Sequence, residues 1–443
     1  MSRLISDFFH GNLFKGDKGV WMIYFFLCMI SLVEVYSASS RMTFNSENHW
    51  GPLISQAGFL LLGLVLILFV HRIPCKWFML IPFILLPLSV MLLIIAILGL
   101  GGGEINSTNR WIKIFGITFQ PSEIAKAALI MSAAVVLAKT QTEKVIRKGG
   151  KERIIVGAMK GKRYMAFAVV STMTCLICGL IFIDNVSTAA ILFVVIVMMM
   201  FIAHIPIDLM FKGAVALTAA VTIYCAILWP LPENVQRSLP GGKRFATVVA
   251  RLARRSQDSS ETALSIKDYN RLLLSDKNSQ TTYAAIAVAN SNVVGLGPGN
   301  SIQRDFLQHA ESDFIFAIIV EELGIGGAIF VLFLYLALLI RCGRIAMKCR
   351  RFFPAYLVLG FGFMMVLQAL TNMGVAVGLL PVTGQTLPLI SKGGTSILIT
   401  SCYIGVILSV SRYAEETQIP LPEVQTSNVQ GETKEYLTDG TMA

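Results

Sequence analysis

The sequence predicts an all-α polytopic membrane protein with about ten transmembrane helices and a large extracytoplasmic loop between the seventh and the eighth helix. Of its 443 residues, 55% are hydrophobic and only 14% are charged, whereas a soluble domain typically carries about 25% charged residues. The mean hydropathy is +0.69. A chain of this composition cannot cover its apolar surface by folding on itself, so we expect it to be solvated by lipid.

Ten apolar runs account for the predicted helices. A helix needs about 20 residues to cross a hydrocarbon core of about 30 Å, and it satisfies every backbone polar group within the segment. The first run has no convincing cleavage site, so we expect a retained helix rather than a signal peptide. Asp184 and Asn185 separate the fifth run from the sixth. The runs cover residues 20–39, 53–71, 78–100, 121–138, 164–183, 186–203, 210–230, 313–340, 354–376 and 393–411.

The positive charge of the short loops predicts how these helices are oriented. Nine Lys or Arg residues and two Glu residues lie between Lys139 and Arg163, and five Arg or Lys residues without an acid lie between Arg341 and Arg351. In a ten-helix count both loops lie on the same side as the two termini, and this side is expected to be cytoplasmic. The predicted organisation is therefore a cytoplasmic N-terminus (residues 1–19), a transmembrane domain (20–412) containing the extracytoplasmic loop (231–312), and a disordered cytoplasmic tail (413–443).

Several other classes of protein are disfavoured by the composition. The net charge is +11, but most of the basic residues lie between helices, where membrane orientation explains them, and we expect no nucleic-acid partner. Cys175 and Cys178 have the spacing of a redox or zinc motif. They fall inside an apolar run without a nearby His or second Cys pair, so we interpret them as small apolar residues of a helix.

The first candidate group of functional residues lies around the start of the fourth helix. Arg110 has a planar guanidinium that suits phosphate oxygens, and Trp111 can pack on a sugar or lipid, although an interfacial anchor is an alternative reading of this Trp. Glu123 and Lys126 are three residues apart, so they share a helix face and can pair. A helix cap with an ion pair that serves packing alone remains an alternative for these two residues.

The next two candidate groups lie on either side of the start of the eighth helix. Glycines at 295, 297 and 299 allow close backbone approach, and free N–H groups there could hold an anion, although a plain turn is an alternative. Asp313 lies where the eighth helix is expected to begin, with Glu321 and Glu322 further along it. A partly desolvated carboxylate at a membrane boundary is well placed to act as a general base. An acid that only stabilises a helix N-terminus is the alternative.

The fourth candidate group lies between the last two helices. Two prolines and several glycines interrupt an apolar stretch from Gly378 to Ser396. Non-helical backbone at membrane depth is tolerated only where it is buried in protein or lines a cavity. We therefore expect a re-entrant segment bordering a cavity, with Lys392 at its edge, and an ordinary outer loop is the alternative.

The motifs in these groups, taken in order, resemble the SEDS family, which includes FtsW, RodA and SpoVE. The resemblance covers nearly all of residues 20–412. The sequence Gly-Gln-Thr-Leu-Pro-Leu at 384–389 is closer to division-type FtsW than to elongation-type RodA. The matching pieces are NRWI at 109–112, QPSE-x-AK at 120–126, NVST at 185–188, G-x-G-x-G-x-S-x-Q at 295–303, SDFIFAIIVEELG at 312–324 and N-x-GV-x-x-GLLPVTG-x-x-LP-x-x-S-x-GGTS at 372–396.

The resemblance implies a set of site residues. Asp313 matches the essential carboxylate of the family and is expected to be catalytic. The residues expected to bind substrate are Arg110, Trp111, Glu123, Lys126, Gln280, Ser301, Gln303 and Lys392. The sequence departs from the family's pattern at three places: an amide at Asn185 replaces an acid, Asn290-Ser-Asn292 replaces a Ser-Gly-Gly stretch, and Lys392 replaces an aromatic residue.

The resemblance also implies an activity. Such a protein would be an inverting peptidoglycan glycosyltransferase of the bacterial inner membrane that polymerises lipid II and releases undecaprenyl diphosphate, with a role in septal wall synthesis. The implied partners are a class B penicillin-binding protein and other division or elongation proteins. No cofactor is certain, and a divalent cation (Mg or Mn) is one candidate for stabilising the leaving group. A lipid II flippase or other transporter and a non-catalytic division scaffold are the alternatives.

Overall fold

The computed structural model describes residues 14–39, 50–99, 102–105, 108–114, 117–148, 151–158, 160–228 and 279–418. Within these residues the fold is a bundle of ten helices of 17 residues or more, and it confirms the polytopic all-α prediction. The ten helices are α2 (Lys18–Ala38), α4 (Gly51–Val70), α6 (Ile81–Ile97), α7 (Pro121–Lys139), α8 (Lys160–Asp184), α9 (Val186–Ile202), α10 (Ile207–Leu228), α15 (Ile315–Lys348), α16 (Phe352–Ala376) and α17 (Gly394–Gln418).

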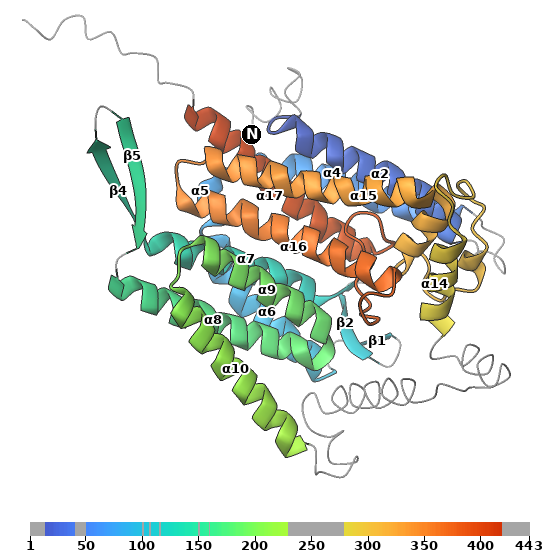
Figure 1. The fold of residues 1–443 in the computed structure, drawn as a ribbon, viewed down its shortest axis with the longest axis horizontal. Coiled ribbons are helices and arrows are strands. Elements are labelled where there is room, and N and C mark those ends of the chain that lie inside the picture. Colours follow the sequence, from blue (N-terminus) through green and yellow to red (C-terminus); the bar gives the residue numbers. More distant parts are fainter. Residues whose placement is uncertain are drawn as a thin grey trace, which may run out of the picture.

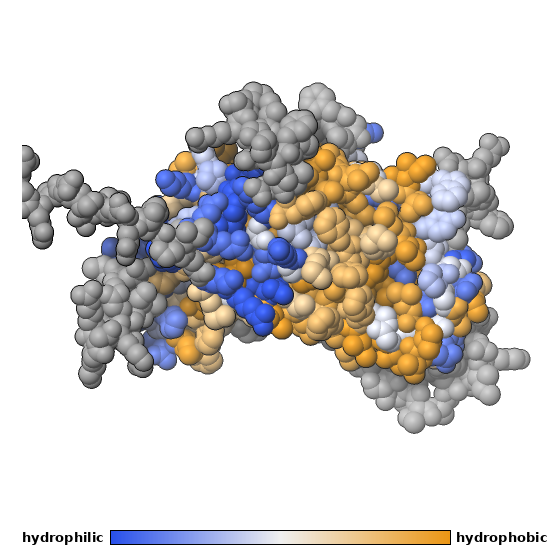
Figure 2. Space-filling view, turned by 90° about the horizontal axis from the view of Figure 1, so that it is seen from above, coloured by the Kyte–Doolittle hydropathy of each residue, from blue (hydrophilic) through white to orange (hydrophobic). Residues whose placement is uncertain are grey.

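The ten helices coincide with the ten predicted apolar runs. Seven of those described are long and apolar enough to cross a membrane, and α6 and α9 are shorter apolar helices. The predicted break between the fifth and sixth runs is also present, because Asn185 caps α9 by accepting a hydrogen bond from the Thr188 N–H at 3.2 Å. The surface agrees with a membrane protein, since Figure 2 shows a hydrophobic band with hydrophilic residues on both sides.

The structure adds elements at the two ends of the bundle that the sequence did not predict. One end carries β1 (Gly102–Ile105), β2 (Thr108–Ile114), β3 (Ile117–Phe119), which form an antiparallel sheet, and α14 (Ser279–Asn290). The opposite end carries the hairpin of β4 (Gln141–Lys148) and β5 (Lys151–Ala158) (Figure 1). Two short helices, α5 (Cys75–Phe78) and η1 (Gln303–Asp305), complete the described elements. The stretches between predicted helices at 101–120, 139–163 and 231–312 therefore contain regular structure.

The most buried helices form the centre of the bundle. Most residues of α7 and α16 are buried inside the protein, whereas most of α4 and α8 face outward. Helix α16 packs against α15, α7, α9 and α17. The side chains of α16 are therefore placed to connect segments that enter the bundle from several directions.

Large parts of the predicted organisation lie outside the described residues. These parts are residues 1–13, most of the long loop (229–278) and the tail from residue 419 onward.

Candidate active site

Asp313 lies in a turn at the α14 end of the bundle, directly before α15. Its backbone N–H and that of Ser312 both donate to the His309 carbonyl at 3.1 Å. The helix itself begins at Ile315 with Phe314 as its N-cap residue, and its first turn carries no acid. Asp313 thus lies one residue before the N-cap of α15, and its role as an acid near a helix N-terminus stays an alternative. The residue is partly buried.

A non-helical segment lies beside this turn, between the end of α16 and the start of α17. Residues 385 and 387–391 of this segment are buried. Its carbonyl groups accept hydrogen bonds from neighbouring helices: Tyr335 Oη donates to Pro388 at 2.5 Å, and Ser31 Oγ donates to Ile390 at 2.9 Å. The predicted irregular backbone is therefore present and largely buried in protein, and we call residues 377–393 the inserted segment. The cavity that it was expected to border stays a prediction.

Hydrogen bonds fasten the Asp313 turn to the inserted segment. Ser391 Oγ donates to the Ser312 carbonyl at 2.6 Å, and the Lys392 backbone N–H donates to the Glu311 carbonyl at 2.8 Å. Gly384 faces the carboxylate itself, since a Cβ atom added to it would lie 3.4 Å from Asp313 Oδ2. Two segments that are about 70 to 80 residues apart in sequence are therefore brought together around this acid.

Glu123 and Lys126 form the predicted ion pair inside the bundle. Lys126 Nζ lies 2.7 Å from Glu123 Oε1, and the Lys126 side chain is fully buried while that of Glu123 is 10% exposed. Lys126 Nζ also donates to Gln368 Oε1 at 3.1 Å. The Gln368 amide in turn donates to the Thr386 carbonyl of the inserted segment at 3.0 Å. The pair is thus connected to the inserted segment through α16.

The glycine-rich loop binds the protein's own carboxylates. The Gly299 N–H donates to Glu322 Oε2 at 2.9 Å and the Ser301 N–H donates to Glu322 Oε1 at 3.2 Å. Glu321 accepts from the Gln303 N–H at 3.3 Å and from the Ser301 hydroxyl. Both carboxylates are fully buried. The N–H groups of this loop do hold anionic groups, and these are the two glutamates of α15 rather than a ligand.

The same loop packs against a kink in α15. Gly324 has φ 70° and ψ −173° inside the helix. A Cβ atom there would lie 2.5 Å from the Gly295 nitrogen, so the loop and the kink require glycine on both sides. Ser301 and Gln303, which the resemblance assigned to substrate, are both buried in this contact with Glu321.

The remaining predicted site residues lie at the same end of the bundle. Arg110 and Trp111 belong to β2, and Trp111 is partly buried. The Arg110 side chain lies outside the described part of the structure. Gln280, in α14, donates to Gln308 Oε1 at 3.3 Å. The structure therefore places Gln280 against the residues that precede the Asp313 turn, whereas the strand of Arg110 and Trp111 packs against α6, α7 and α8.

Two residues of α16 that the sequence analysis did not single out connect the candidate groups. Gln368 links the ion pair to the inserted segment. Asn372 donates to the carbonyl of Asp313 at 2.9 Å and to that of Gln385 at 2.6 Å. A usable signal was present, because polar residues four apart in an apolar run lie on one helix face and are costly in a membrane.

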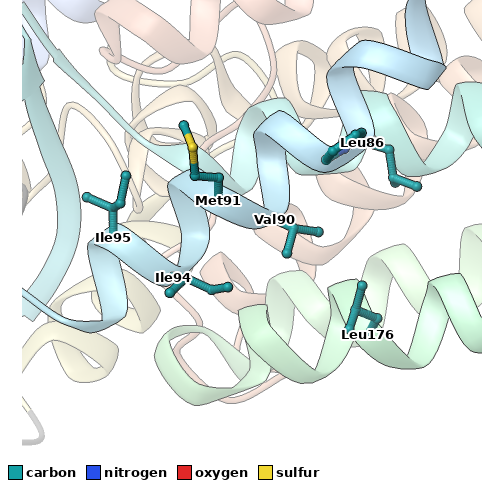
Figure 3. A pocket seen from close by; sticks show the side chains of 7 residues that line it. Leu86, Val90, Met91, Ile94, Ile95 and Leu176 are labelled. Carbon is teal, nitrogen blue, oxygen red and sulfur yellow. The ribbon is translucent and has the colours of Figure 1, made fainter.

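A groove on another face of the protein carries no such chemistry. It has a volume of about 480 Å³ and is lined by apolar residues of α6 and one of α8, including Pro87, Met91 and Leu176 (Figure 3). None of its lining residues has a titratable side chain, so it offers no acid or base. The candidate active site is the Asp313 turn with the inserted segment.

A resident metal ion has no evident protein cage in the described part of the chain. Its residues contain no group of three or more His, Cys, Asp or Glu side chains arranged to hold such an ion. The divalent cation implied by the resemblance therefore stays a prediction.

Comparison with known proteins gives a consistent result. Residues 18–416 match the family model described as cell cycle protein, FtsW, RodA and SpoVE. Among curated proteins the chain is 30% identical over 413 residues to a probable peptidoglycan glycosyltransferase FtsW of Coxiella burnetii, covering 90% of this chain and 96% of that protein. An Enterococcus hirae protein of the same name is 30% identical, covering 94% of this chain and all of its relative.

Solved structures with the same fold were found as well. One is a peptidoglycan synthase complex studied for the coordination of polymerization and crosslinking, with a TM-score of 0.63, 23% identity, and coverage of 90% of this chain and 98% of that chain. Another is the rod-shape-determining protein RodA of Thermus thermophilus, with a TM-score of 0.57, 22% identity, and coverage of 90% and 97%.

Proposed function

The chain belongs to the FtsW, RodA and SpoVE family of cell cycle proteins, and from this premise we propose that it is a peptidoglycan glycosyltransferase. It joins lipid II units into glycan strands and releases undecaprenyl diphosphate. The curated relatives carry the FtsW name, which supports a role in septal wall synthesis during cell division.

One observation carries this proposal: the Asp313 carboxylate is held beside Gly384 by a turn that is fastened to the inserted segment. A sugar hydroxyl is a poor nucleophile until a positioned base takes its proton, which is worth about 10²–10⁴ in rate. Asp313 takes the proton of the acceptor's 4-hydroxyl. The oxygen attacks the anomeric carbon of the other chain, the bond from that carbon to the diphosphate oxygen breaks, and the configuration is inverted.

The leaving diphosphate needs positive charge as its bond breaks. Arg110 of β2 and Lys392 of the inserted segment are our candidates, and Arg110 is preferred because its planar fork matches phosphate oxygens. Lys126 is a poorer candidate, since its ammonium is fully buried against Glu123 and Gln368.

We further propose that the protein lies in the bacterial cytoplasmic membrane with both termini in the cytoplasm. The α14 end then faces outward, where the donor and acceptor lipids meet, and the basic β4–β5 hairpin faces the cytoplasm in agreement with the positive-inside rule. A class B penicillin-binding protein is the proposed partner, which the likeness to a peptidoglycan synthase complex supports.

A lipid II flippase is the alternative of a different class. Its support in the sequence was a set of charged residues within helices, which could line a path: Glu123, Lys126, Glu321 and Glu322. Glu321 and Glu322 are engaged by the backbone N–H groups of the glycine-rich loop, so they fasten a loop and are not available to line a path. A non-catalytic scaffold is the second alternative. It does not require a carboxylate held beside the inserted segment, so the position of Asp313 favours an enzyme.

Polymerisation of lipid II by the purified protein, with and without its transpeptidase partner, tests the proposal. We expect glycan strands from the wild type and none from Asp313→Ala. A matched control is Asp305→Ala, which removes an acid with a 56% exposed side chain from the preceding turn and should leave polymerisation intact. Flipping of lipid II in vesicles without polymerisation would contradict the proposal, as would rescue of growth by Asp313→Ala.

A further inference from the structure

Asn372 is the first residue of the motif at 372–396, but the resemblance assigned it no role. It lies in α16, the residue is 1% exposed, and its single amide nitrogen donates two hydrogen bonds. One acceptor is the carbonyl of Asp313 and the other is that of Gln385. The Asn372 side chain thus joins three parts of the protein: the backbone of Asp313, the inserted segment and helix α16.

The surroundings of Asn372 make it a junction rather than an isolated contact. Gln385 is held on its other side, because its own amide donates to Thr188 Oγ1 of α9 at 2.7 Å. One turn earlier on α16, Gln368 connects the inserted segment to Lys126. The Asp313 turn, the inserted segment and the buried ion pair are therefore all linked to one face of α16.

The polar side chain is costly at this depth, which argues against a role in packing alone. Asn372 Oδ1 has no hydrogen-bond donor among the described residues, and a buried unsatisfied polar atom costs about 1–3 kcal/mol. A role in helix packing alone would favour an apolar residue of the same size. What the amide supplies is a pair of N–H donors aimed at two backbone carbonyls.

We propose that Asn372 is a positioning residue for the glycosyl transfer: it acts through Asp313 by fixing that residue's backbone against the inserted segment. This inference rests on the proposed function. Misplacing a catalytic group by about 1 Å can cost about 10²-fold in rate. Because Asn372 is buried behind the Asp313 turn, its loss slows the chemical step and leaves the binding of lipid II largely unchanged.

Two variants and one control test this role in the full-length protein with lipid II. Asn372→Leu removes both donors at similar volume. Asn372→Asp keeps the shape but turns a carboxylate oxygen toward the two carbonyls. Thr371→Val is the control, because the Thr371 hydroxyl donates to the Leu367 carbonyl of its own helix, at 2.7 Å, and so does not tie α16 to the Asp313 turn.

We expect both Asn372 variants to lower kcat by about 10- to 100-fold. Their KM for lipid II should change by less than about threefold, because the loss acts on positioning and not on binding. The Thr371 control should keep the wild-type kcat. Rates are expressed per folded protein, as measured by thermal unfolding in detergent.

The inference is overturned if either Asn372 variant has the kcat of the control, or if KM rises in the same proportion as kcat falls. A wild type that does not polymerise lipid II refutes the proposed function itself, so the two failures are distinguishable.

Discussion

The buried pair of Glu123 and Lys126 allows a quantitative prediction about stability. Replacing Lys126 by Met leaves the Glu123 carboxylate without its cation at a site where it is only 10% exposed. Removing one partner of a buried ion pair typically costs about 3–5 kcal/mol, because the other charge stays buried and unpaired. Gln368 Oε1 loses its donor at 3.1 Å as well, which adds about 1–3 kcal/mol if the oxygen stays unsatisfied.

A double-mutant cycle measures the interaction energy between Glu123 and Lys126 apart from the other contacts of each residue. In Glu123→Gln with Lys126→Met no charge remains, and replacing a whole buried pair by neutral residues is often close to neutral in stability. The loss in the double variant should therefore be smaller than that of Lys126→Met alone, with a coupling energy of about 3 kcal/mol or more. Denaturant unfolding of the purified protein in detergent micelles measures all four members of the cycle. A double variant as unstable as the sum of the two single variants would refute this reasoning.

Three further predictions concern the inserted segment and the kink. Gly324→Ala should unfold or strongly destabilise the protein in thermal unfolding, because its φ is 70° and its Cβ would lie 2.5 Å from the Gly295 nitrogen; wild-type stability would show that the kink is not required. Tyr335→Phe should cost about 1 kcal/mol in the same assay, since it removes only the bond to the Pro388 carbonyl, and an unchanged midpoint would contradict that bond. Gly384→Ala should lower the rate of polymerisation more than stability, because its φ is 62° and the new Cβ would lie 3.4 Å from the proposed catalytic carboxylate; equal rates for this variant and the wild type would contradict the placement.

The helices could be predicted because an apolar run of about 20 residues crosses a lipid bilayer as an α-helix. Backbone groups in the hydrocarbon must pair within the segment, so each run became a helix, and Asn185 marked a break that hydropathy alone does not define. Hydropathy marks where an apolar run ends, but a helix can continue beyond that point into water. Helix α15 continues past the predicted end at residue 340 to Lys348, and this extension includes basic residues, which have high helix propensity.

The candidate site was predictable where contacts are local and was missed where they are not. Glu123 and Lys126 are three residues apart on one helix, so their pairing follows from helix geometry. The partner of the glycine-rich loop lies about 20 residues away in α15, and spacing cannot show that Glu321 and Glu322 occupy its N–H groups. Asn372 meets Asp313 only because α16 folds back against α15.

The strands were not predicted, although each pairs with a neighbouring segment of the chain. Ile112 and Ile114 flank Lys113, and Ile117 and Phe119 flank Thr118, so alternation is present but covers only three residues at a time. Residues 141–158 show no such alternation. An alternation this short does not indicate a strand, because the pattern is read over about four to eight residues. The sequence predicted no strand in residues 102–119 or 141–158, and the structure adds them.

The pH dependence of polymerisation, measured for the wild type and for Asp313→Asn, tests the central claim most directly. A carboxylate that takes a proton from the acceptor hydroxyl works only in its ionised form, so kcat/KM of the wild type should fall on the acidic side. We expect the Asn variant, shown to be folded by thermal unfolding, to lose about 10²-fold or more in rate and to lack the acidic fall. An Asn variant with the wild-type rate and pH profile would contradict the assignment of Asp313 as the base.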